Sequence, residues 1–99
     1  MRGHILITGS SGLVGTALRG ALLGRGDLVA GLDLRAAPDA GHGDVCKPDD
    51  VVKAARGCRG IVHLAAVSRV VWGERDPVHC WSTNVDGTRH VLEAAAGSS

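Results

Sequence analysis

Three glycines, Gly9, Gly12 and Gly15, recur at every third position near the start of the chain. They directly follow the apolar stretch HILIT at residues 4–8, which is typical of a short buried strand. A turn of this kind can bring backbone N–H groups against a pyrophosphate at the positive end of a helix, where side chains would obstruct the approach. We therefore interpret Gly9 as permitting the turn, Gly12 as admitting the phosphates, and Gly15 as allowing close helix packing.

The next apolar stretch, DLVAGLDL at residues 27–34, contains the carboxylate of Asp33 near its end. An acid at this position can accept hydrogen bonds from both ribose hydroxyls of an adenosine. Its charge would repel a 2′-phosphate, so it favours NAD over NADP. Arg35 could hold a 2′-phosphate, stack on adenine or point into water, and these alternatives stay open.

The glycine spacing alone is weak evidence, because the chain contains 15 glycines and the spacing is G-x-x-G-x-x-G rather than G-x-G-x-x-G. Its context adds weight, since a strand precedes the turn and a helix follows it. The alternative is a plain strand–helix–strand unit with a glycine-rich turn.

Strand and helix patterns alternate along the chain. We expect strands within 4–8, 27–34 and 58–66, and helices within 11–26, 44–57 and 78–97. This order, βαβαβα, predicts an α/β fold with a Rossmann-like parallel sheet and flanking helices. Residues 1–99 would form one partial NAD(P)-binding domain, truncated after about its first half.

Helical periodicity also predicts which side chains turn inward. In the first helix these are Val14, Ala17, Leu18, Ala21 and Leu22, and in the last helix Trp81, Val85, Thr88, Leu92 and Ala95. In the short helix they are Val51, Val52 and Ala55. Gly87 lies inside the last helix at a cost of about 1 kcal/mol relative to alanine, which indicates close packing there.

Composition excludes several classes of function. The chain has 11 Lys and Arg, 10 Asp and Glu, two Trp, no Phe and no Tyr, so neither a basic run nor an aromatic platform for nucleic acid is present. The apolar runs are too short to span a membrane, and the first residues resemble a strand rather than a signal peptide, so we expect a cytoplasmic protein. Three cysteines without a C-x-x-C pair indicate neither a disulfide framework nor a metal site.

Five features resemble the extended short-chain dehydrogenase/reductases in order and spacing: TGSSGLVG at 8–15, Asp33, GDV at 43–45, HLAA at 63–66 and NVDGT at 84–88. More narrowly, the chain resembles NAD-dependent epimerases and dehydratases that act on nucleotide sugars. The resemblance covers essentially the whole chain, but only the N-terminal part of such a protein.

The resemblance implies a set of cofactor-binding residues, namely Gly9, Ser11, Gly12, Leu13, Val14, Gly15, Asp33, Leu34, Arg35, Asp44, Val45, Leu64, Ala65, Ala66 and Asn84. In that family the glycine segment lines the pyrophosphate, and the residues from Asp33 onward surround the adenosine ribose. Asp44 and Val45 match a pair that flanks adenine. The small residues at 64–66 lie beneath the nicotinamide half, and Asn84 steadies that segment.

Several of these residues also have a purely structural interpretation. Asp44 could cap the turn that follows it, and Asn84 could face solvent. We expect His63 to be a packed or hydrogen-bonded histidine rather than a catalyst, and we expect His79 and His90 to lie on the helix surface. Two further residues, Ser68 and Arg69, are weak candidates for a sugar pocket.

The chemistry of the family requires a tyrosine base with a lysine four residues later, and this chain contains no tyrosine. We therefore expect no catalytic residue and no activity from the chain alone, with a nucleotide sugar as partner only if the missing half is supplied. The alternative is a non-catalytic dinucleotide-binding module or sensor. The last strand would form an unpaired sheet edge, which predicts marginal stability and self-association.

Overall fold

A sheet of three parallel strands forms the centre of the molecule. The computed structural model describes residues 3–37, 39, 41–65 and 76–97. The strands are β1 (Ile5–Thr8), β2 (Val29–Leu32) and β3 (Gly60–His63), and their order in the sheet is β2-β1-β3. This confirms the predicted parallel sheet, although each strand is shorter than its apolar stretch.

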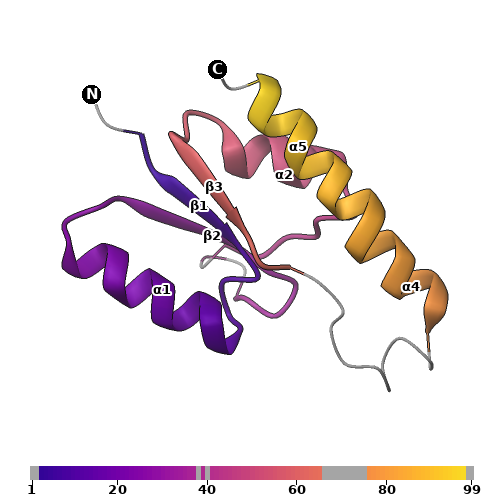
Figure 1. Cartoon of the computed structure of the whole chain (residues 1–99), viewed down its shortest axis with the longest axis horizontal. Coiled ribbons are helices and arrows are strands. Elements are labelled where there is room, and N and C mark those ends of the chain that lie inside the picture. The colour runs from indigo at the N-terminus through magenta and orange to yellow at the C-terminus, as the bar shows by residue number, and fades with distance from the viewer. Residues whose placement is uncertain (1–2, 38, 40, 66–75, 98–99) are drawn as a thin grey trace.

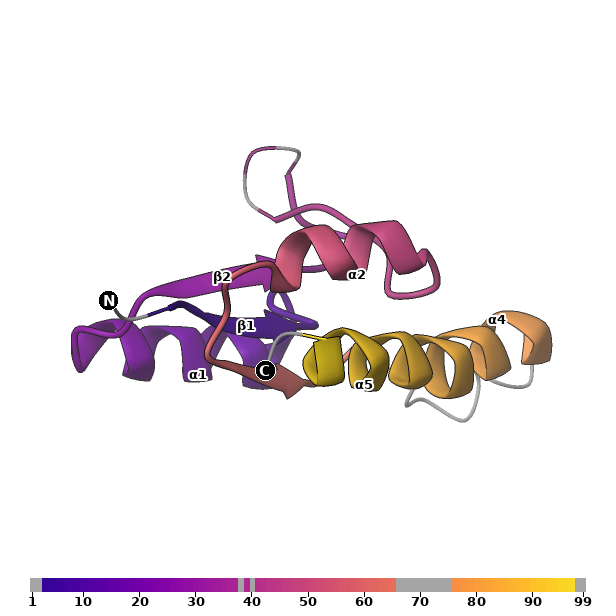
Figure 2. The ribbon, with the colours of Figure 1, turned by 90° about the horizontal axis from the view of Figure 1, so that it is seen from above.

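Helices cover both faces of this sheet. Helix α1 (Leu13–Gly24) lies on one side, and α2 (Pro48–Ala55) and α5 (Gly87–Gly97) lie together on the other, as Figure 1 shows. The short helix α4 (Pro77–Trp81) and a π-helical turn, η1 (Ser82–Asp86), run directly into α5. Seen from above, α1 and α2 lie on opposite sides of the strands (Figure 2). The predicted order βαβαβα is therefore confirmed, with the last helix divided into three segments.

The strand register brings three chain segments together at the carboxyl end of the sheet. Thr8 at the end of β1 is paired with Leu32 of β2 and with His63 of β3. Beyond β2, Asp33 forms an isolated parallel bridge with His42. The carboxyl ends of the strands therefore meet, and the turns that follow them surround a common space.

The hydrophobic core lies between the sheet and the pair of helices α2 and α5. Its buried members are Leu6, Leu32, Val45, Val51, Ala55 and Val91. Short apolar strands between helices need this cover because both of their faces carry apolar side chains. The core thus fixes the positions of α2 and α5 relative to the strand ends.

The predicted inward face of the last helix is wrong. Trp81, Val85 and Leu92 are exposed, and the buried positions are instead Thr83, Gly87, His90 and Val91. The reason lies at Gly87, where an added Cβ would stand 2.7 Å from Cγ2 of Val45. Close backbone approach selects this face of the helix, so Gly87 packs tightly as predicted while the more apolar stripe faces outward.

Two other inward faces were predicted only in part. In α1 just Gly15 and Leu22 are buried, while Val14 is exposed. In α2 Val51 and Ala55 are buried and Val52 is exposed. Three strands cover less helix surface than the apolar residues of these helices provide.

The two ends of α1 are capped in different ways. Ser10 and Ser11 precede this helix and are of a residue type that often caps helices, but the N-cap of α1 is Gly12, without a side-chain cap. Gly26, with φ of 87°, follows the end of α1 as expected for a glycine in the left-handed region. Within the described ranges, no helix is long and apolar enough to cross a membrane. The cytoplasmic location stays a prediction.

Candidate functional site

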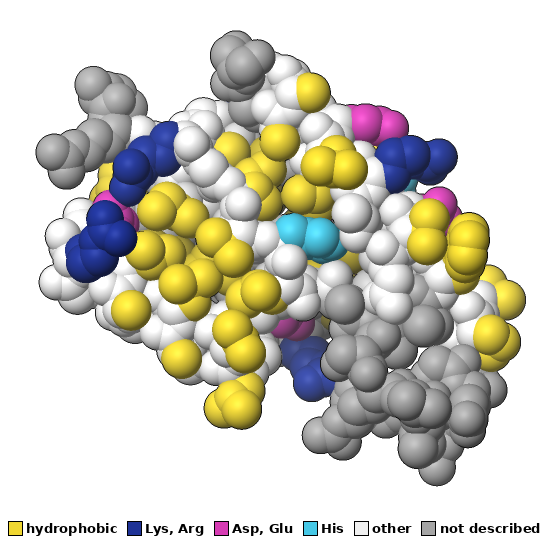
Figure 3. Space-filling view, in the orientation of Figure 1, with side chains coloured by type: hydrophobic (Ala, Val, Ile, Leu, Met, Phe, Trp, Pro, Cys, Tyr) yellow, Lys and Arg dark blue, Asp and Glu magenta, His cyan; other side chains and the backbone are white. Residues whose placement is uncertain are grey.

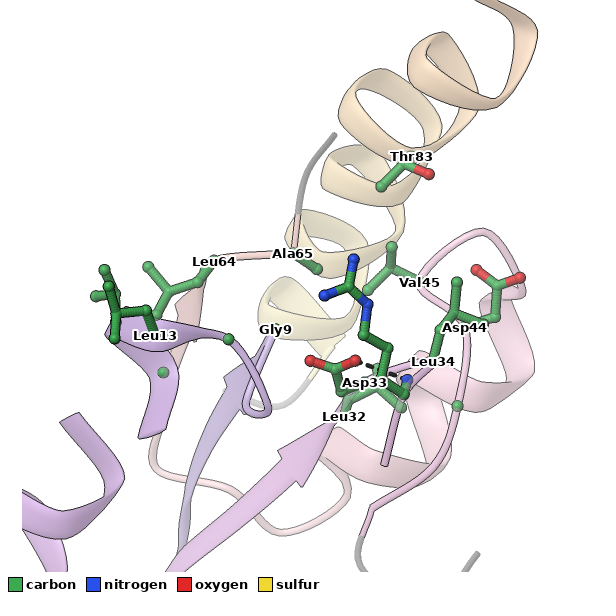
Figure 4. Close-up of a pocket in the computed structure, with 15 residues that line it drawn as sticks. Gly9, Leu13, Leu32, Asp33, Leu34, Asp44, Val45, Leu64, Ala65 and Thr83 are labelled. Atoms are coloured by element: carbon green, nitrogen blue, oxygen red, sulfur yellow. Dashed lines mark hydrogen bonds between the residues drawn. The ribbon is translucent and has the colours of Figure 1, made fainter. Parts of the chain in front are cut away.

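A cavity of about 430 Å³ lies at the carboxyl ends of the strands. Five segments contribute to its wall: the glycine turn with the start of α1, the end of β2, the segment before α2, the segment after β3, and η1. The lining residues are Gly9, Gly12, Leu13, Val14, Gly15, Leu32, Asp33, Leu34, Arg35, Gly43, Asp44, Val45, Leu64, Ala65 and Thr83. Figure 4 shows Asp33 between Leu13 and Leu64 on one side and Asp44 and Val45 on the other.

The glycine turn is shaped by backbone contacts that no side chain could share. Gly9 has φ of 75°, and an added Cβ would lie 2.8 Å from the carbonyl carbon of Leu64 and 2.9 Å from N of Ala65. An added Cβ on Gly15 would overlap the carbonyl oxygen of Gly9. Glycine at these two positions therefore lets the turn approach both α1 and the segment after β3.

The N-terminus of α1 opens onto the cavity through Gly12, Leu13 and Val14. No side chain of the described residues caps this helix end, so its first N–H groups lack a side-chain acceptor. These groups carry the positive end of the helix dipole. An anionic group is therefore the chemistry that this wall of the cavity would accept.

The carboxylate of Asp33 ties the glycine turn to the end of β2. Its Oδ2 accepts a hydrogen bond from N of Ser11 at 2.9 Å, and its Oδ1 accepts one from N of Arg35 at 2.8 Å. Ser11 is absent from the cavity lining and contributes through this backbone bond. Asp33 is thus oriented by two N–H groups while it lines the cavity.

Asp44 both shapes a turn and lines the cavity. Its Oδ1 accepts a hydrogen bond from N of Cys46 at 2.9 Å, and its own N–H donates to Oδ2 of Asp50 at 3.0 Å. The structural interpretation of Asp44 as a turn residue therefore applies, and the side chain also lies at the cavity wall. The two interpretations of this residue are compatible.

A buried histidine of α5 fixes the backbone of Val45. His90 is buried, and its Nδ1 donates a hydrogen bond to the carbonyl oxygen of Val45 at 2.7 Å. The expected surface position of His90 is therefore wrong, because it lies on the same buried helix face as Gly87. His79 is exposed, as predicted.

The predicted contacts omitted three residues that line the cavity, Leu32, Gly43 and Thr83. Of these, Thr83 is the one from the last helix. It is buried in η1, and its Oγ1 lies 3.7 Å from Sγ of Cys46. Burial raises the pKa of that thiol from its ordinary value of 9.0. Thr83 lies four positions before Gly87 on one helix face, so the close packing inferred for Gly87 was a signal that could have found it. The neighbouring Asn84 does not line the cavity.

Some predicted positions lie outside the described residues, namely Ala66, Ser68 and Arg69. His63 is half-buried and hydrogen-bonded to two threonines, as expected for a structural histidine. In the described part of the chain, no group of three or more potential ligand residues could hold a metal ion. The cavity therefore offers backbone donors, a carboxylate and apolar walls, which suit an elongated ligand with phosphate and sugar groups.

Comparison with known proteins places these features in a family. Residues 5–98 match the model described as the NAD dependent epimerase/dehydratase family. A 3-beta-hydroxysteroid dehydrogenase of Mycolicibacterium neoaurum is 34% identical over 93% of the chain, and a UDP-glucose 4-epimerase of Streptomyces lividans is 34% identical over 99%. A short-chain dehydrogenase/reductase superfamily protein from Agrobacterium tumefaciens, solved with bound NAD, superimposes with a TM-score of 0.84 at 35% identity over 96% of the chain.

The chain is much shorter than these proteins. It spans 28% of the dehydrogenase, 33% of the epimerase and 29% of the solved structure. The similarity therefore concerns about a third of each relative.

Proposed function

The chain belongs to the NAD-dependent epimerase/dehydratase family, and we propose that it binds NAD in the cavity at the carboxyl ends of its strands. The observation that carries this proposal is the position of Asp33 beside the glycine turn, within the same cavity as the N-terminus of α1. A similar protein has been solved with bound NAD, which supports the same ligand class here.

The residues present fit such a dinucleotide. The surroundings of Gly9 and Gly15 leave no room for a Cβ, and the N-terminus of α1 has no side-chain cap, so this wall suits a pyrophosphate. Asp33 would accept hydrogen bonds from the adenosine ribose, and Asp44 with Val45 would flank the adenine. Bound NAD would supply a nicotinamide ring that accepts or donates a hydride.

The other half of the ligand would lie near Leu64 and Ala65. These residues follow β3, and the backbone there already contacts Gly9 closely. We propose that this wall borders the nicotinamide ribose. Ala66 and Asn84 stay predicted contacts of the same half.

We further propose that these 99 residues hold the cofactor without catalysing the sugar chemistry of the family. A tyrosine base is absent from the sequence. A similar epimerase is named for UDP-glucose, so a nucleotide sugar is the substrate class that a longer protein of this kind would use. The alternative is a dinucleotide-binding module or sensor, which needs no substrate. Incubation with NAD and UDP-glucose should yield neither NADH nor UDP-galactose, and turnover would contradict this part of the proposal.

Calorimetric titration with NAD tests the binding site directly. We expect a Kd below about 1 mM for the chain and a loss of at least about tenfold in affinity for Asp33→Ala. Asp39→Ala is the matched control, since Asp39 is an exposed acid in the same loop region and should not change affinity. NADP should bind more weakly than NAD because the carboxylate repels a 2′-phosphate. A folded chain that binds neither dinucleotide would overturn the proposal.

A further inference from the structure

The side chain of His63 joins the central strand to the last helix beside the cavity. Its Nδ1 lies 2.6 Å from Oγ1 of Thr8 in β1, and its Nε2 lies 3.0 Å from Oγ1 of Thr88 in α5. Taken alone, either hydrogen bond could run in either direction, because both a hydroxyl and an imidazole nitrogen can donate or accept. The other bonds of the two threonines settle the direction.

The hydroxyl of Thr8 fixes the proton at one end of the ring. This side chain is fully buried, and its Oγ1 accepts a hydrogen bond from N of Ala65 at 3.2 Å. It also shares the N–H of Leu64, at 3.0 Å, with the backbone carbonyl oxygen of Thr8, which lies at 3.0 Å as well. A hydroxyl oxygen has two lone pairs and one proton. Leu64 and Ala65 present only donors to this oxygen, so among the hydrogen-bond partners of Oγ1 in the described residues Nδ1 of His63 is the one that can accept its buried proton. Nδ1 therefore carries no proton itself.

The hydroxyl of Thr88 fixes the proton at the other end. It donates to the carbonyl oxygen of Asn84 at 2.7 Å, and a carbonyl can only accept. Thr88 has no second proton to give, so Nε2 of His63 must donate to it. The two ends independently require the same species, a neutral imidazole protonated at Nε2.

We propose that His63 in this neutral form is a positioning residue of the cofactor cavity. Through Thr8 it holds the N–H groups of Leu64 and Ala65, which form the wall beside the proposed nicotinamide half. Through Thr88 it holds the carbonyl of Asn84 in η1, next to the segment that presents Thr83 to the same cavity. This role rests on the proposed binding of NAD.

Protonation of the ring would break this arrangement. A proton on Nδ1 would face the hydroxyl proton of Thr8 across 2.6 Å, so Thr8 would have to release one of the two N–H groups or leave its own proton without an acceptor. Burial lowers the pKa of His63 from its ordinary value of 6.5 and is the one cause that acts on it. We therefore expect the wall to be ordered at neutral pH and to loosen under acid conditions.

The charged and titratable side chains on the elements next to His63 interact with other partners. On the helix side, Arg89 lies 3.9 Å from the carboxylate of Asp86 and 3.8 Å from that of Glu93, and His90 bonds to the carbonyl of Val45. On β1's side, His4 is bonded to the carbonyl of Ala54. None of them contributes to the pKa shift of His63.

Nitrogen NMR of the ring in the full chain tests the proton arrangement without any variant. We expect a neutral His63 protonated at Nε2 at neutral pH, and amide signals of Leu64 and Ala65 that titrate with the same midpoint as the ring. His79, exposed on α4, is the internal control, and its replacement by asparagine should not move those amides. A cationic ring, a proton on Nδ1, or amides that ignore the ring titration would overturn the proposal.

Binding measurements test the positioning role separately. His63→Ala should weaken NAD binding by about tenfold, since Thr8 then loses its acceptor. His63→Asn should recover part of that loss, because its amide oxygen can accept from Thr8 in place of Nδ1, and His79→Asn should change nothing. A folded His63→Ala chain with wild-type affinity would overturn the role. A wild-type chain that shows the expected ring and amide signals but binds no NAD would contradict the proposed function and leave the proton arrangement supported.

Discussion

The two faces of the sheet differ in how completely this chain closes them. On the face of α2 and α5, Leu6 and Val51 are 0% exposed and Val91 is 5% exposed. On the face of α1, Ile7 and Leu22 are buried, but Leu13 is 91% and Val14 64% exposed, although both are apolar. We call these the closed face and the open face.

This difference separates the two halves of the cavity. The proposed adenine wall, with Val45, is built into the closed core and held by His90 of α5. The start of α1, which supplies the proposed phosphate wall, belongs to the open face. Figure 3 shows hydrophobic side chains gathered broadly where α1 lies beside the strands. Exposed apolar patches of this kind mark surfaces that can bind another polypeptide.

The largest expected effect is on the free energy of unfolding, and it comes from a substitution in the core beneath the closed face. Val51→Ala should lower the free energy of unfolding by about 2–3 kcal/mol, because the deleted methyl groups leave a cavity in a fully packed site. Val52→Ala is the matched control on the same helix; Val52 is 51% exposed, and the change should stay within about 0.5 kcal/mol. Urea denaturation measures both, and equal losses would show that the α2 face is not closed.

A somewhat smaller effect is expected where α1 meets the glycine turn. Gly15→Ala should cost about 2 kcal/mol and weaken NAD binding, because the new methyl group would overlap the carbonyl oxygen of Gly9. Gly20→Ala in the same helix has nothing within 4 Å of its added Cβ, so it should stabilise the chain by up to about 1 kcal/mol. Thermal unfolding and NAD titration of both variants check this. Similar behaviour of the two variants would contradict a special role for Gly15.

The fold order and most of the cavity could be predicted from sequence because they depend on local requirements. Gly9 needs a positive φ, Gly15 needs close approach, and Asp33 stands where a strand ends, so each has a backbone reason that is visible in the residue type. Parallel strand pairing then brings the segments together without further information.

The helix faces could not be predicted in the same way. Counting apolar residues identifies a stripe with Trp81 and Leu92, but it does not say which stripe the sheet covers. The contact between Gly87 and Val45 decides this, and it joins residues far apart in the sequence. Thr83 and His90 were missed or misplaced for the same reason, since both lie on the face that Gly87 selects.

A substitution on the open face should change self-association of the chain more than it changes the free energy of unfolding. β3 forms one edge of the sheet, and Ile61 packs toward the closed core, so its neighbour Val62 points to the open face. Val62→Lys should reduce concentration-dependent self-association, because a lysine on an edge strand opposes pairing with another chain, and it should cost at most about 1 kcal/mol of stability. Sedimentation velocity measures the association. Val52→Lys is the control on the closed side and should associate as the wild type does; a monomeric wild-type chain at all concentrations would contradict the predicted edge association.

The smallest expected effect is the pH dependence of stability, and it belongs to the closed face. His63 contacts Thr88 of α5 and Cys46 contacts Thr83 of η1. The pKa of His63 is lowered from 6.5 by burial, so the unfolded chain binds more protons than the folded chain below that pH. The stabilisation is therefore complete above 6.5 and is lost as the pH falls through the lowered value.

The thiol of Cys46 has the opposite sign. Burial raises its pKa from 9.0, so its stabilisation is complete below that pH and is lost as the pH rises through the raised value. Urea denaturation at a series of pH values should show the free energy of unfolding falling on both the acid and the alkaline side. His63→Asn should flatten only the acid decline and Cys46→Ser only the alkaline one. An acid decline that survives in His63→Asn would mean that protonation of another group, and not of the histidine between β1 and α5, opens the closed face.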